Sequence, residues 1–86
     1  MYADPRKALD HVKTLLKYNP SAEQLNVLRN RVHDWLIEAK QKDADNPGVG
    51  RRAAPYEWLF QLVDRVTAKQ LSFAQAIEEI RYYERE

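Results

Sequence analysis

Side chains that commonly carry out chemistry are few in this sequence, and their spacing fits no familiar site. His11 and His33 fall in different predicted helices and belong to no H-x-x-x-H or E-x-x-H pattern, so they form no zinc motif. The chain has no cysteine, which excludes disulfides and thiolate metal ligands. We therefore interpret both histidines as surface residues and expect no metal site.

The remaining candidates for catalysis are equally isolated. Ser21 and Ser72 are better explained as helix caps than as nucleophiles, because each is followed three residues later by glutamine. Glu57, Asp64 and Glu78 are scattered along the chain and are not paired for acid–base work. We expect no catalytic residue and no cofactor.

A short glycine–arginine segment, G-V-G-R-R, is the one feature that suggests an anion. It matches neither a P-loop nor a G-x-G-x-x-G fingerprint. Its Arg51 and Arg52, together with Arg65 and Lys69, predict a small basic patch that could contact DNA or RNA. Against this, the chain has 14 basic and 13 acidic residues, a net charge of +1, which is too balanced for a surface that coats phosphates.

The last two predicted helices have the short separation of a helix-turn-helix. The second of them, however, carries more acidic than basic residues, and acidic groups repel phosphate. A nucleic-acid-binding regulator that uses Arg51, Arg52 and the basic edge of the preceding helix is therefore the second hypothesis, not the first.

The densest apolar stretch, residues 55–66, is the segment around which we expect the fold to be organised. Five of its residues repeat at helical spacing and share one face: Tyr56, Leu59, Leu62, Val63 and Val66. Trp58 and Phe60 lie on opposite sides of that face, so the apolar arc is wide enough to contact several neighbours. A strand is the alternative, since alternate residues are aromatic or apolar, but no second strand is evident to pair with it.

Three more helices are indicated by the same periodicity and by start and stop signals. Asp4-Pro5 begins a helix over residues 5–18, and Asn19-Pro20 ends it. The capping-box patterns S-A-E-Q and S-F-A-Q begin helices over residues 22–42 and 73–84. With the central helix over about 55–68, the 86 residues form a single all-α domain.

A loop over residues 43–54 holds both glycines and the Asn46-Pro47-Gly48 turn signal. Because the other two connections are short, we expect a four-helix, bundle-like domain made of two αα-hairpins, the first helix with the second and the third with the fourth. The sequence leaves open whether the loop is ordered.

A surplus of large apolar side chains suggests that the protein binds another protein. Trp58, Leu62, Arg65 and Lys69 form one edge of the central helix, and aromatic residues and arginine are enriched in interface cores. Val27 and Ile37 lie off the apolar stripe of the second helix. These six residues are the candidate partner-binding surface, and the alternative is that Trp58 and Phe60 complete the core of a monomer.

The function that we expect is thus a small non-enzymatic protein–protein interaction module, such as an adaptor, inhibitor or regulatory subunit, which binds another protein or a second copy of itself. No apolar run approaches the roughly 20 residues that cross a bilayer. The N-terminus lacks the apolar core of a secretory signal. We therefore expect a cytoplasmic protein with no membrane contact.

Overall fold

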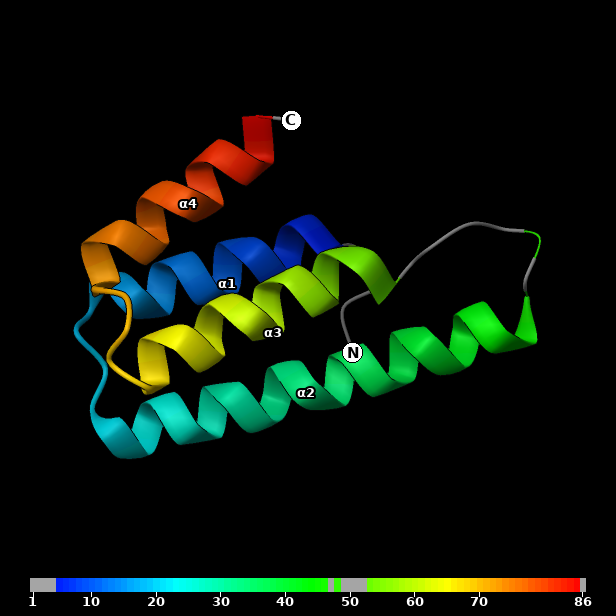
Figure 1. Ribbon diagram of the computed structural model, residues 1–86, viewed down its shortest axis with the longest axis horizontal. Helices are drawn as coiled ribbons and strands as arrows, with labels where there is room; N and C mark the ends of the chain where they lie inside the picture. The colour runs from blue at the N-terminus through cyan, green and yellow to red at the C-terminus, as the bar shows by residue number, and fades with distance from the viewer. Residues whose placement is uncertain (1–4, 47, 49–52, 86) are drawn as a thin grey trace.

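The computed structural model describes residues 5–46, 48 and 53–85, and these residues contain four α-helices and no strand (Figure 1). The helices are α1 (Pro5–Lys17), α2 (Ala22–Asp45), α3 (Ala53–Thr67) and α4 (Phe73–Arg85). The predicted all-α class is confirmed. Asp4, proposed as the cap of α1, lies outside the described residues.

Helix α3 packs against each of the other three helices. In Figure 1, α2 runs antiparallel to α3, α1 runs in the same direction as α3, and α4 runs antiparallel to α1 on the side away from α2. The closest pairings are α2 with α3 and α1 with α4, and the contact between α3 and α4 is slighter. The helices that pack most closely are therefore not those of the expected hairpins, because side-chain packing rather than the length of a connection decides which helices approach closely.

The core contains side chains from all four helices, and α3 and α2 supply the most. It consists of Ala8, Leu9, Val12, Leu16, Leu25, Leu28, Val32, Trp35, Leu36, Ala39, Ala53, Tyr56, Leu59, Leu62, Val63, Val66, Ala76 and Ile80. Every residue predicted for the inner face of the central helix is among them. Helix α4 supplies only Ala76 and Ile80 to this buried set, and its Phe73, Ile77 and Tyr83 pack against the core while partly exposed.

Both predicted capping boxes are present. At the start of α2, the Ser21 Oγ accepts from the Gln24 amide at 3.2 Å, and the Gln24 Oε1 accepts from the Ser21 amide at 2.9 Å. At the start of α4, Ser72 and Gln75 make the same two hydrogen bonds, both at 3.1 Å. These bonds satisfy backbone donors that have no partner inside the helix, which accounts for the serine and glutamine at this spacing.

The connection between α2 and α3 is shorter than the predicted loop over 43–54. Helix α2 continues to Asp45 and α3 begins at Ala53, two residues before Pro55. The Asp43 Oδ2 accepts from the Ala53 amide at 3.0 Å, so a side chain of α2 caps the start of α3. Pro55 is tolerated in the first turn because its missing N–H would have had no intrahelical partner there.

Helix α3 ends in a Schellman motif, in which the Lys69 amide donates to the Val66 carbonyl at 3.1 Å and the Gln70 amide to the Arg65 carbonyl at 2.9 Å. Lys69 takes the left-handed conformation that this motif requires, with φ of 62°. Glycine normally fills the position, because a Cβ atom there is sterically unfavourable. Asn19, with φ of 51° after α1, is the other described non-glycine residue in this region.

We predict that Lys69→Gly stabilises the protein by about 0.5–1 kcal/mol. Glycine removes the strain of the left-handed conformation. Glycine also gives the unfolded chain more conformational entropy, but this cost cancels only part of the gain. Urea unfolding followed by circular dichroism measures the change. Lys69→Ala is the matched control, since it removes the ammonium group but keeps the Cβ atom. Equal stability of the glycine and alanine variants would contradict the explanation.

Candidate functional site

The predicted partner-binding edge of α3 is not a continuous exposed surface. Leu62 is only 3% exposed and belongs to the core, so it is not available to a partner, which corrects the prediction. Trp58 is half-buried, and its ring stacks on Tyr83 of α4, with ring centroids 4.2 Å apart and planes inclined by 13°. The apolar arc of α3 is wide because α3 has three helices to contact, and Leu62 lies inside it.

Phe60, on the other side of α3, is also largely covered by side chains of the same chain. The His33 ring lies 5.4 Å from its ring, and the Arg29 guanidinium lies 5.4 Å from its centroid. Arg29 also forms an ion pair with Asp64 at 2.7 Å. Because a guanidinium over an aromatic face is attracted to it, this group of α2 and α3 side chains closes the edge of the core around Phe60.

Arg65 and Lys69, the two basic residues of the predicted edge, have different surroundings. Arg65 lies 3.8 Å from Glu79 of α4, so its charge is partly balanced within the chain. Lys69 is exposed and lines a groove. Arg51 and Arg52, the predicted nucleic-acid contacts, lie outside the described residues.

Val27 and Ile37 are exposed, at 55% and 53%, but they do not form one patch. Because they are ten residues apart in α2, Val27 and Ile37 point in directions about 80° apart around the helix axis. Val27 lines a small hollow between α1 and α2 of about 300 Å³, together with His11, Leu15 and others. Ile37 lines none of the hollows described in this section.

A groove of about 940 Å³ lies at the end of the bundle where both short connections lie. We call it the end groove. It is lined by Pro20, Ala22, Leu25, Asn26, Val66, Thr67, Lys69, Gln70, Leu71, Ser72, Phe73 and Gln75. Six of these residues are apolar and six are polar, and among the apolar ones Leu25 and Val66 are almost fully buried. Lys69 is the one charged residue among these lining residues, so the groove mixes apolar and polar side chains around a single positive group.

Sequence reasoning placed only Lys69 of the end groove in a binding surface. The segment from Thr67 to Leu71 contains no glycine or proline, so neither the turn nor the left-handed residue in it was marked. The two capping boxes were the sequence signal that could have located the groove. They fix where α2 and α4 begin, and both of those ends border the groove.

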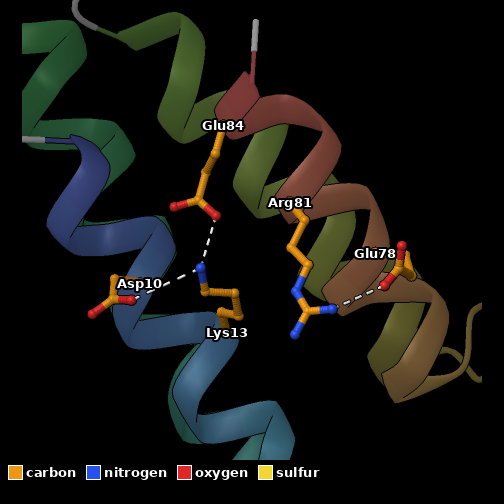
Figure 2. A network of polar contacts seen from close by, with 5 residues as sticks. All are labelled: Asp10, Lys13, Glu78, Arg81 and Glu84. Atoms are coloured by element: carbon orange, nitrogen blue, oxygen red, sulfur yellow. Dashed lines mark hydrogen bonds and ion pairs between the residues drawn. The ribbon is translucent and has the colours of Figure 1, made fainter.

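An ion pair between Lys13 and Glu84 attaches α4 to α1. Lys13 Nζ lies 2.8 Å from the Glu84 Oε1 and 4.0 Å from the Asp10 Oδ1 (Figure 2). The Lys13 side chain is only 17% exposed, so this pair is less screened by water than a fully exposed one. Together with the Trp58–Tyr83 stack, it holds the C-terminal half of α4, where Ile80 is the only buried residue.

Neither a metal centre nor a membrane-spanning segment is evident in the part of the chain that the structure describes. In the described ranges, no group of three or more histidine, aspartate or glutamate side chains is placed to bind a metal ion. None of the described helices combines the length and the apolar character needed to cross a bilayer.

We predict that Trp58 and Tyr83 are energetically coupled. A double-mutant cycle of Trp58→Ala and Tyr83→Ala, measured by urea unfolding, should give a coupling of about 0.5–1.5 kcal/mol from the stacked rings. The same cycle with Tyr82→Ala in place of Tyr83→Ala is the control and should give almost none, since Tyr82 is 68% exposed. Similar couplings in both cycles would show that the stack does not hold α4.

Comparison with protein-family models, with curated proteins and with solved structures finds no match to this chain. Any function must therefore be argued from the chain's own side chains.

Proposed function

We propose that this protein is a small non-enzymatic protein-binding module, acting as an adaptor, inhibitor or regulatory subunit, and that the end groove binds an apolar segment of a partner protein. The observation that carries the proposal is the groove itself. It brings the half-buried Leu71 and Phe73 beside Leu25 and Val66, which are almost fully buried, from three helices and one turn. Grooves of this kind bind an amphipathic segment of another protein through its apolar side chains.

Lys69 indicates the chemistry of the partner. It is the one charged residue that lines the groove, so an acidic group beside the apolar side chains of the bound segment would complement it. Lysine is also an unfavourable choice for its left-handed backbone position. Strain of this kind is often retained where a side chain serves binding. We therefore propose a partner segment with apolar residues and a neighbouring aspartate or glutamate.

The nucleic-acid alternative has less support in the surface charges. Arg29 is paired with Asp64, and Arg65 lies near Glu79. The exposed face of α4 adds Glu78, which would repel a phosphate backbone. No described feature favours this alternative over the groove.

A selection of short random peptides displayed on phage tests the proposal without knowledge of the natural partner. We expect enriched peptides with apolar residues and an adjacent Asp or Glu. Leu71→Asp should weaken their binding about tenfold or more by placing a charge in the apolar wall. Lys69→Gly should weaken it about two- to fivefold by removing the ion pair. Val27→Asp, on a different surface, is the control and should leave binding unchanged.

The Lys69→Gly variant also separates binding from folding, because it is expected to be more stable than the natural chain. Enriched peptides that bind all variants equally, or a library that yields no binder, would contradict the proposal. Duplex DNA is the second probe, and we expect no retardation at about 50 mM salt. Retardation that weakens steeply with added salt would instead favour the nucleic-acid alternative.

A further inference from the structure

Helix α4 contains fewer buried residues than the other three described helices. Only Ala76 and Ile80 are buried in α4, against four residues in α1 and six each in α2 and α3. Its closest packing is with α1, and its contact with α3 is slighter. Because proteins open locally where few side chains are buried, α4 is the helix most suited to separate from the rest without global unfolding.

The start of α4 is capped by its own residues. Ser72 and Gln75 exchange two hydrogen bonds of 3.1 Å, whereas the start of α3 is capped by Asp43 of α2. Among the described residues, the last backbone hydrogen bond that ties the preceding turn to α3 is donated by the Gln70 amide. Helix α4 can therefore move about Leu71 with its cap intact.

The polar contacts of α4 with its neighbours are strongest at its C-terminal end. There, Glu84 pairs with Lys13 of α1 at 2.8 Å, and the Tyr83 ring stacks on Trp58 of α3 (Figure 2 shows the ion pair). In the middle of the helix, Glu79 lies 3.8 Å from a guanidinium of α3, and its buried Oε2 has no hydrogen-bond donor among the described residues. Because an unsatisfied buried oxygen is unfavourable, polar attachment is concentrated at the C-terminal end of α4.

The N-terminal end of α4 forms part of the end groove. Phe73 and Gln75 of α4, with Leu71 and Ser72 of the turn before it, are four of the twelve residues that line the groove. Gln75 and Tyr83 are eight residues apart, which is about 12 Å along the helix. If α4 moves away from α1 and α3, the groove loses its α4 side chains. A segment bound there therefore has its full contacts only while α4 is docked.

We propose that α4 is a latch for the end groove. It docks and releases as a unit, the Trp58–Tyr83 stack and the Lys13–Glu84 ion pair hold it docked, and a partner segment in the groove binds only the docked state. Docking and binding then stabilise each other, since a coupling between two sites is reciprocal. The inference rests on the proposed function, because it concerns how the same groove is regulated.

Thiol labelling measures the release, because the natural chain has no cysteine. Ala76→Cys places a thiol at a buried position of α4, and Val63→Cys places one in α3, where we expect access only through global unfolding. The opening constant should be about tenfold or more larger for the α4 thiol, with a weaker dependence on urea, because a local opening exposes less surface. Equal opening constants would overturn the proposal. Hydrogen exchange of the Ile80 and Val63 amides makes the same comparison in the natural chain.

Tyr83→Ala tests the contact that holds the latch. In the Ala76→Cys background, it should raise the opening constant about three- to tenfold by removing the stacked ring. Tyr82→Ala is the matched control and should leave the constant almost unchanged, since Tyr82 is 68% exposed. Equal effects of the two substitutions would overturn the proposal.

The peptide most enriched in the phage selection, synthesised in free form, tests the coupling. At about ten times its Kd, it should lower the opening constants of both thiols roughly tenfold, because it binds neither the released nor the unfolded state. A lower constant for the Val63→Cys thiol alone would show that the groove binds without α4. The proposed function would then stand, and the latch would be overturned. Unchanged constants at both positions, or a library without a binder, would overturn both.

Discussion

The packing of α3 against the other three helices is the constraint on which the rest of the structure depends. One helix can serve three neighbours only if its apolar arc is wide, and α3 buries six residues around its axis. The two sides of this apolar arc are covered by side chains of α2 and α4. Arg29 and His33 of α2 lie over Phe60, and Tyr83 of α4 stacks on Trp58. Most of the apolar surface that suggested a companion is thus covered by the chain itself.

The same arrangement explains where the end groove lies. The capping boxes fix the starts of α2 and α4 at one end of the bundle, and α3 ends there in a strained turn. Apolar side chains from these ends meet without a further element to cover them, which leaves the end groove. Helix α4 has the smallest share of the core, and Tyr82 on its outer face is 68% exposed.

Local features of the structure could be predicted from the sequence because local rules decide them. Helical periodicity gave the four helices, and serine–glutamine spacing gave both capping boxes. Which helices approach most closely depends on contacts between distant residues, so the expected hairpins did not give the closest pairings. Leu62 was assigned both to the inner face by periodicity and to the partner-binding edge by its neighbours Trp58 and Arg65, and its burial shows that only the first assignment is right. The end groove escaped notice because Lys69 occupies a turn position that glycine normally marks. The binding function itself stays a prediction.

Native-state hydrogen exchange is the measurement that tests the central role of α3 most directly. Amides within α3, such as those of Leu62 and Val63, should exchange only through global unfolding, because α3 cannot open without separating from all three neighbours. Amides near the end of α4 should exchange through a smaller opening of lower free energy, since that helix buries so little. If α3 exchanged as readily as α4 in sub-global openings, α3 would not be the element on which the fold depends.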